Sequence, residues 1–299
     1  MQVAEHEAIK SLARTASLEM TVHDVPQLRA ASELLGDTRR IYVSHLPGQA
    51  WEDTLATCSA IHALGATPIP HVPVRRVRSR EELESFLDHC TTHAGVSEIL
   101  LIAGDYPQSV GPYHTSMDVL STGILAKHGI ARLSVAGHPE GHPVVSPDEL
   151  RRAEREKIEF ALGNHLSLTL LTQFFFDAQP FIEWQHHLPI PAGANERIRV
   201  VAGLAGPARL TTLLRYAAIC GVGPSMRALG TRPTSIGKML TERGPESIVQ
   251  ALATSLAPQS MGIHLYSFGG LMRTCAWLAA VEQGRFRMEG QGFVVHDRE

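Results

Sequence analysis

The 299-residue sequence predicts an α/β fold, a TIM (β/α)8 barrel made by one domain over residues 1–299. Three observations lead to this prediction. Eight short runs rich in β-forming residues are spread along the chain, and segments with helical periodicity separate them. This alternation is typical of parallel strands joined by helical crossovers. Eight such units in a chain of this length favour a closed barrel over an open sheet.

The predicted strands also indicate where the connecting helices begin. They are, in chain order, SLEMTV (17–22), RIYVS (40–44), TPIPHV (67–72), EILLIAG (98–104), RLSVAG (132–137), LTLLTQFF (168–175), RIRVVAGL (197–204) and GIHLYSF (262–268). Residues 1–14 predict a helical extension before the first strand. Ser79 with Glu82 forms a capping-box pattern, and Ser146 precedes a proline at the first helical position. Between the last two strands, residues 206–221 and 245–257 predict two helices, one more than the repeat needs.

Composition and charge narrow the class of partner. Hydrophobic residues make up 44% of the chain and charged residues 19%, which is ordinary for a globular protein with a large core. The formal net charge is −3 with scattered basic residues, so we expect neither a nucleic-acid nor a membrane partner. Four dispersed cysteines and no apolar leader or spanning segment favour a cytoplasmic protein. We expect a small-molecule substrate and leave a homo-oligomer open.

Polar residues late in the predicted strands are the candidate site residues, because a parallel barrel carries its active site at the carboxyl ends of its strands. They are Glu19, Ser44, His45, His71, Asp105, His138, His142, Gln173, Tyr266 and Ser267. A carboxylate between two apolar neighbours would face the lumen, where burial raises its pKa and suits a general acid. We therefore expect Glu19 to be that acid. Gln173, an amide in an apolar strand, needs a polar partner if it is buried.

Each candidate also has a purely structural interpretation. Asp105 could serve only to bond the backbone of its own turn, and His71, flanked by prolines, could be a hydrogen-bonded histidine at a strand end. His138 and His142 have the spacing of a helical metal pair, but Pro139 and Gly141 argue against a helix there. We therefore expect no metal site. At least one of the three phenylalanines after Gln173 should pack under the helices.

Taken together, these segments resemble the methylenetetrahydrofolate reductase family. The resemblance rests on Ser-Leu-Glu at 17–19, Pro-His-Val at 70–72, Gly-Asp-x-Pro at 104–107, His-Pro-Glu-Gly-His-Pro at 138–143 and Thr-Gln-Phe-Phe-Phe-Asp at 172–177. It runs in order over most of the chain, and the segments at 138–143 and 172–177 together are the specific part of it. The resemblance implies interconversion of 5,10-methylenetetrahydrofolate and 5-methyltetrahydrofolate by hydride transfer.

The resemblance also implies roles for individual residues. Glu19 matches the family's general acid, Asp105 the carboxylate that holds the pterin, and Gln173 the amide that contacts folate and nicotinamide. Tyr216 matches an aromatic residue that stacks on either substrate. Ser44, His71, Asp105, His138 and His142 fall at flavin positions. FAD would be the cofactor, with NADH or NADPH as the reductant.

Departures from the family pattern keep alternatives open. Ala103 stands where an arginine is common, and the lysine that usually precedes the sixth strand has no clean counterpart. One alternative is therefore a flavin-free enzyme in which NADH reduces the folate directly. A second is a metal-dependent hydrolase using His45, His71, His138 and His142. A third is a carrier of folate or flavin that has lost turnover.

Overall fold

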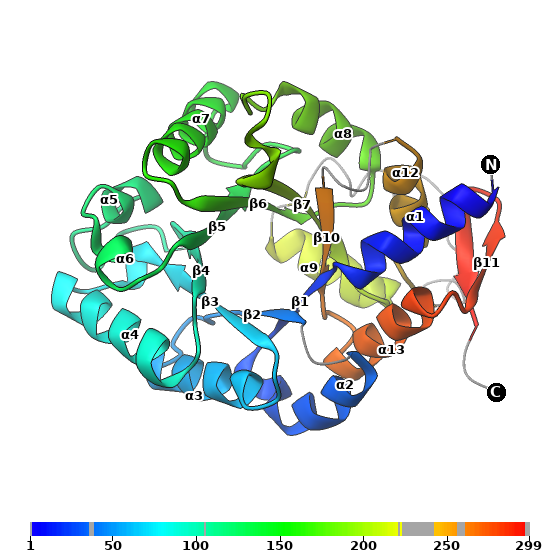
Figure 1. Cartoon of the computed structure of the whole chain (residues 1–299), viewed down its shortest axis with the longest axis horizontal. Coiled ribbons are helices and arrows are strands. Elements are labelled where there is room, and N and C mark those ends of the chain that lie inside the picture. The colour runs from blue at the N-terminus through cyan, green and yellow to red at the C-terminus, as the bar shows by residue number, and fades with distance from the viewer. Residues whose placement is uncertain are drawn as a thin grey trace.

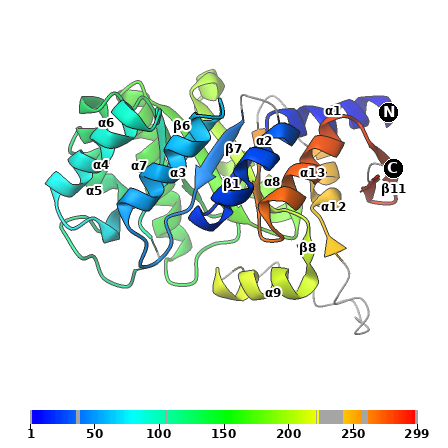
Figure 2. The same cartoon turned by 90° about the horizontal axis from the view of Figure 1, so that it is seen from below.

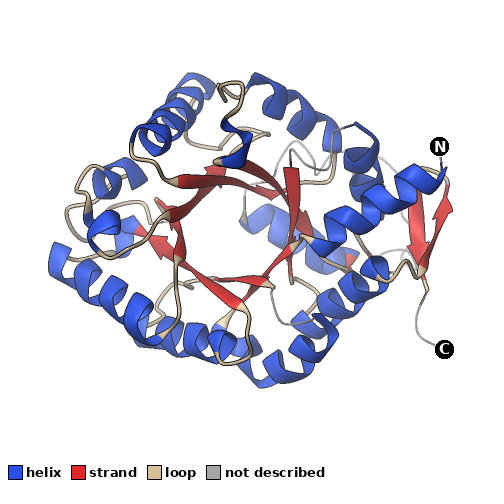
Figure 3. Cartoon of the chain, in the orientation of Figure 1, coloured by secondary structure: helices blue, strands red, loops and turns tan. Residues whose placement is uncertain are grey.

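Eight parallel strands close into one barrel, which confirms the predicted fold. The structure is a computed structural model that describes residues 2–35, 39–104, 106–220, 222, 242–255 and 261–296. The strand order around the barrel is β1-β10-β7-β6-β5-β4-β3-β2. Figure 1 looks down the barrel, and Figure 3 shows its strands as a ring enclosed by helices.

The strands lie within about two residues of their predicted bounds. They are β1 (Ser17–Met20), β2 (Arg40–Val43), β3 (Thr67–Pro73), β4 (Glu98–Ile102), β5 (Arg132–Gly137), β6 (Ser167–Phe174), β7 (Ile198–Ala205) and β10 (Met261–Tyr266). The first strand is shorter than predicted because Thr21 caps a 3-10 helix, η1 (Val22–Gln27). The Thr21 hydroxyl accepts a hydrogen bond from the backbone N–H of His23, and this turn takes the chain out of the sheet.

Helices follow the strands and cover the outside of the barrel. They are α1 (Gln2–Arg14), α2 (Leu28–Leu35), α3 (Trp51–His62), α4 (Arg80–His93), α5 (Ser116–Leu120), α6 (Ile124–Lys127), α7 (Pro147–Gly163), α8 (Ala178–His187), α9 (Leu210–Ile219), α12 (Glu246–Ser255) and α13 (Leu271–Glu282), with short 3-10 turns η2 (Val74–Arg76) and η3 (Ala194–Glu196). The expected caps at Ser79 and Ser146 are present. No helix in the described ranges is long and apolar enough to cross a membrane.

Two small antiparallel sheets lie outside the barrel. Strands β11 (Phe286–Glu289) and β12 (Gly292–Val295) form a hairpin after α13, and β8 (Ala208–Arg209) pairs with β9 (Glu242–Arg243). Helices α9 and α12 confirm the expected extra helix between the last two barrel strands. Helix α9 follows the carboxyl end of β7, and Figure 2 places it on the opposite side of the barrel from α1. It therefore lies at the mouth where the carboxyl ends of the strands gather.

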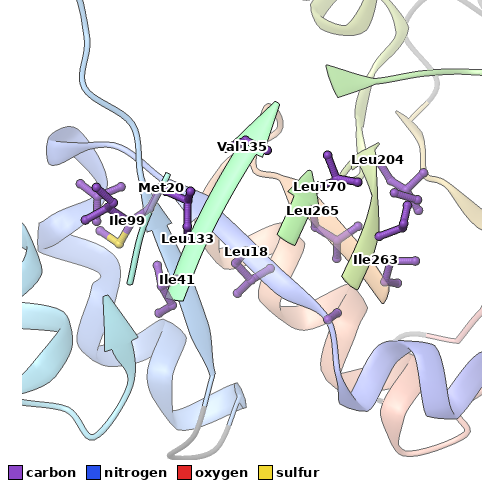
Figure 4. Close-up of a cluster of buried hydrophobic side chains, with 14 of the residues drawn as sticks. Leu18, Met20, Ile41, Ile99, Leu133, Val135, Leu170, Leu204, Ile263 and Leu265 are labelled. Atoms are coloured by element: carbon purple, nitrogen blue, oxygen red, sulfur yellow. The ribbon is translucent and has the colours of Figure 1, made fainter. Parts of the chain in front are cut away.

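The main core lies between the strands and the helices, because alternate strand residues face outward. Figure 4 shows part of it, with Leu18, Met20, Ile41 and Ile99 among the buried side chains. The strand residues between them face the lumen. They include a smaller apolar cluster of Tyr42, Ile69, Leu100, Leu171 and Val201. Outward-facing residues therefore stabilise the barrel against its helices, and lumen residues are free to carry chemistry.

A charged cluster closes the amino-terminal end of the lumen. The buried carboxylate of Glu98 accepts hydrogen bonds from Arg40, at 2.5 Å, and from the Ser134 hydroxyl, at 2.8 Å. The hydroxyl groups of Ser134 and Tyr42 are 2.8 Å apart. Burial raises the pKa of Tyr42 to about 12, so this phenol stays neutral. This end of the barrel is filled, which leaves the opposite mouth for a ligand.

Candidate functional site

Glu19 lies at the centre of a polar cluster in the lumen, near the carboxyl end of β1. The Ser44 hydroxyl donates a hydrogen bond to its Oε1 atom at 2.6 Å. On the other oxygen, Oε2, Nε2 of His71 lies 3.3 Å away and Nε2 of His264 lies 3.7 Å away. The side chain of Glu19 is 15% exposed and that of His71 12%, whereas His264 is fully buried. Three predicted site residues, Glu19, Ser44 and His71, therefore meet as expected.

The charge state of Glu19 differs from our expectation. Burial by itself raises the pKa of this carboxyl, as we expected, but the charge of His71 and the ring N–H groups of His71 and His264 lower it by more. The pKa of Glu19 is therefore below its ordinary value, and the prediction that burial leaves it protonated is wrong. An ionised Glu19 beside His71 can take part in proton transfer only as a pair with this imidazole.

His264 is the functional residue that sequence reasoning missed. It lies in the middle of β10, whereas we examined strand ends. Its Nδ1 atom is 2.9 Å from the Ser17 hydroxyl, and its ring contacts the edge of Tyr42 at 4.9 Å between centroids. Strand alternation from Tyr266 could have found it, because residues two apart on a strand face the same side.

Three buried polar atoms converge in this cluster without a hydrogen-bond partner among the residues that the structure describes. They are Oε2 of Glu19, Nε2 of His71 and Nε2 of His264. They face one another at 3.3 and 3.7 Å, as charged or polar neighbours without a hydrogen bond of good geometry. A polar atom of a bound ligand can satisfy several of them together, which makes this point of the lumen the strongest candidate for ligand contact.

The segment of residues 172–177 divides its side chains between core and mouth. Phe175 is buried and stacks on Phe181 of α8. This confirms the prediction that at least one of the three phenylalanines packs under the helices. Phe174 turns inward toward Tyr266. Gln173 is exposed at the end of β6, and its own Oε1 accepts a hydrogen bond from the Phe174 N–H at 3.1 Å. This amide is therefore not buried, and its N–H donors have no hydrogen-bond partner in the described part of the chain.

Aromatic rings line the mouth from the lumen to α9. Tyr266 lies edge-on to His264 at 4.8 Å, and its ring stacks on Phe268 at 5.5 Å. Tyr216 of α9 stacks on the same Phe268 at 4.1 Å with 14° between the ring planes. Tyr216, a predicted substrate residue, is thus linked to the Glu19 cluster through successive rings. Phe268, which we did not single out, is the ring that joins them.

His138 and His142 form a separate pair after β5. Their ring centroids are 5.5 Å apart. Burial, then Lys157 and His142, lower the pKa of His138 to about 4, so its ring is neutral. Behind it, the buried Glu154 accepts hydrogen bonds from Trp184 Nε1 at 3.0 Å and from the His138 backbone N–H at 3.4 Å. No described contact joins this pair to Glu19.

The histidines of the hydrolase alternative do not gather. His45 stacks on Trp51 at 4.2 Å, and its Nδ1 lies 3.0 Å from the Thr54 hydroxyl. Burial, helped by Arg76 and His71, lowers the pKa of His45 to about 4. Among the residues with described positions, no group of three His, Cys, Asp or Glu side chains could hold a metal ion. Asp105, the predicted pterin carboxylate, lies outside the described residues.

Comparison with known proteins finds only distant similarity to solved structures. No protein-family model matches the chain. Among similar solved structures, dihydropteroate synthase from Thermus thermophilus has 13% identity and a TM-score of 0.44, covering 90% of this chain and 94% of that one. A sugar phosphate isomerase/epimerase from Parabacteroides distasonis has 11% identity and a TM-score of 0.38, covering 89% and 96%. At these identities the similarity concerns the fold alone.

Proposed function

We propose that this protein is an oxidoreductase that interconverts 5,10-methylenetetrahydrofolate and 5-methyltetrahydrofolate by hydride transfer. The observation that carries the proposal is the meeting of Glu19, Ser44 and His71 at the barrel mouth, in a chain whose segments 138–143 and 172–177 resemble the methylenetetrahydrofolate reductases. The exposed amide of Gln173 and the ring of Tyr216 lie at the same mouth and suit a ligand with a flat, polar head.

The reaction needs one proton and one hydride. Opening the five-membered ring requires a proton on the departing nitrogen and leaves a cationic iminium, and a hydride on the methylene carbon then gives the methyl group. In the proposed mechanism the proton comes from the pair of Glu19 and His71, whose facing atoms are 3.3 Å apart. The ionised carboxylate of Glu19 also stabilises the iminium charge. A positioned acid of this kind contributes about 10²- to 10⁴-fold in rate.

The residues at the flavin positions do not fit FAD well. Ser44 donates its hydroxyl to Glu19, and His71 faces the same carboxylate. His138 is neutral, and His142 is exposed. None of these four side chains offers a permanent positive charge, which a diphosphate favours. We therefore derive no step through a flavin. We propose NADH or NADPH as the direct hydride donor, with its own diphosphate held outside these four positions.

A reductase assay with the purified protein tests this function. We expect oxidation of NADH or NADPH that depends on 5,10-methylenetetrahydrofolate, a colourless protein, and rates that added FAD does not change. A yellow protein that loses its activity when stripped of flavin would restore the FAD-dependent enzyme. Folate binding without turnover would favour the carrier, and neither binding nor turnover would reject the folate assignment.

A further inference from the structure

The register between β1 and β10 builds a line of three polar groups in the lumen. Ser17 lies directly opposite His264, and Glu19 lies opposite Tyr266. Ser17 and Glu19 are two residues apart and face the same side of β1. The imidazole of His264 therefore stands between them, with Nδ1 2.9 Å from the Ser17 hydroxyl and Nε2 3.7 Å from Glu19 Oε2.

The hydrogen atoms in this line can be assigned by elimination. An ionised Glu19 only accepts, so the nitrogen that faces it carries the hydrogen in the favourable arrangement. In a neutral ring the other nitrogen then has to accept, and the Ser17 hydroxyl is its donor. Burial lowers the pKa of His264 more than Glu19 raises it, which keeps the ring neutral. At 3.7 Å the Nε2–H group acts on Glu19 as an oriented dipole rather than as a full hydrogen bond.

We propose that Ser17 and His264 are a positioning pair. The Ser17 hydroxyl holds the ring of His264 in the tautomer that turns Nε2–H toward Glu19 Oε2, and this N–H favours the ionised carboxylate of Glu19. His264 is fully buried, whereas His71 is 12% exposed. In this arrangement His264 sets the charge of Glu19, and His71 lies nearer to the solvent at the mouth.

The groups around Glu19 support this division of roles. Ser44 donates to Oε1 from β2, His71 faces Oε2 from β3, and His264 faces Oε2 from β10. Tyr266 is the fourth titratable or polar neighbour, and burial followed by the charge of Glu19 raises its pKa. Tyr266 donates its hydroxyl to the Thr172 carbonyl at 2.9 Å. It is thus engaged elsewhere, and His264 is the remaining donor on that side.

NMR of the unliganded protein tests the pair without any substrate. With ¹⁵N-histidine labelling we expect the Nε2–H tautomer at His264, and with ¹³C-glutamate labelling an ionised Glu19 down to low pH. In His264→Leu the pH at the titration midpoint of Glu19 should rise by about 1 to 3 pH units. His264→Gln, whose amide N–H can replace Nε2–H, should recover most of that change. Ser17→Ala should mix the two tautomers and raise the Glu19 midpoint by less.

Ser134→Ala is the matched control, because Ser134 is a buried lumen serine that contacts Tyr42 and Glu98 instead of Glu19. It should leave the Glu19 midpoint unchanged. An Nδ1–H tautomer in the wild type, or an unchanged midpoint in folded Ser17→Ala and His264→Leu proteins, would overturn the pair. The catalytic part of the inference rests on the proposed function. If that function holds, the pH profile of kcat/KM in the Ser17 and His264 variants should shift together with the titration midpoint of Glu19. An inactive protein with the expected NMR result would reject the reductase and keep the pair.

Discussion

Glu19 and His71 meet inside the barrel with 3.3 Å between Oε2 and Nε2, although the strands that carry them are not neighbours. Strand β2 lies between β1 and β3, and the closure of the barrel turns both side chains into one lumen. Because His71 pairs with the carboxylate, the burial of Glu19 produces an ionised group rather than a neutral acid. In the proposed reaction, the proton for ring opening therefore has to come from the pair of Glu19 and His71.

We expect Glu19→Gln to abolish most turnover while folate still binds. The amide keeps the shape of the side chain but can neither take the proton from His71 nor stabilise a cationic iminium. The folate-dependent rate should fall by about 10²- to 10⁴-fold. Stopped-flow reduction and a folate titration measure the two effects separately. Unchanged turnover would remove Glu19 from the mechanism.

The same substitution should change the response of stability to acid. The pKa of Glu19 is lowered from 4.5 in the folded protein, so its ionised form stabilises the fold fully above about pH 4.5. That contribution is lost as the pH falls toward the folded pKa. Glu19→Gln has no such contribution to lose, so its unfolding free energy should fall less than that of the wild type between about pH 5 and pH 3. Equal losses, measured by denaturant titration, would contradict the ion pair.

Local patterns in the sequence predicted most of the fold. Apolar runs gave the strands, and Ser79 and Ser146 marked helix starts because a cap is decided by a few adjacent residues. The charge of Glu19 could not be predicted, since it depends on His71 and His264 from distant segments. The irregular pairing between β6 and β7 next to Gln173 also could not be predicted, because it depends on contacts between two strands.

The rings at the mouth should govern affinity for a flat ligand. The ring of Phe268 stacks with those of Tyr216 and Tyr266. Phe268→Leu and Tyr216→Leu should each weaken folate binding by about 3- to 10-fold, and Tyr216→Phe should keep it. Phe293→Leu, in the hairpin beside Trp277, is the control and should leave the affinity unchanged. Isothermal titration that shows equal affinities for all four variants would exclude stacking.

Glu154→Gln should stabilise the protein at neutral pH. Burial raises the pKa of Glu154 above 4.5 despite the hydrogen bond from Trp184. A raised pKa means that the carboxyl contributes most below about pH 4.5 and that this contribution is lost as the pH rises through the folded value. The amide stays neutral and can still accept from Trp184, so the melting temperature should exceed that of the wild type by about 2 °C at pH 7 and match it near pH 4.

Glu149→Gln, in the same helix, should change the melting temperature at pH 7 in the opposite direction. Glu149 is exposed, and its hydrogen bonds from Ser146 lower its pKa. Its contribution is therefore present at neutral pH and lost in acid, so the variant should melt below the wild type at pH 7. If Glu154→Gln also melted below the wild type at pH 7, the buried carboxylate would be stabilising as an ion, and our account of its burial would be wrong.

Gly203 is a position that should not tolerate a methyl group. A Cβ atom there would lie 2.2 Å from the Thr172 carbonyl oxygen and 2.8 Å from the Tyr266 ring. The Gly203 N–H donates to the Thr172 hydroxyl at 2.9 Å, and Tyr266 donates to the Thr172 carbonyl. The absence of a side chain thus lets β6 shift its register, which turns Phe174 inward and leaves Gln173 at the mouth.

Gly203→Ala should therefore lower stability and weaken the site together. Because the clash is with backbone, we expect a loss of about 1 to 3 kcal/mol in unfolding free energy. Folate affinity should fall as well, since Gln173 and Tyr266 both move. Gly163→Ala, at the end of α7 where nothing lies within 4 Å, should be neutral or slightly stabilising. Denaturant unfolding and folate titration of both variants check this, and a Gly203→Ala protein with wild-type stability would show that β6 does not depend on this close approach.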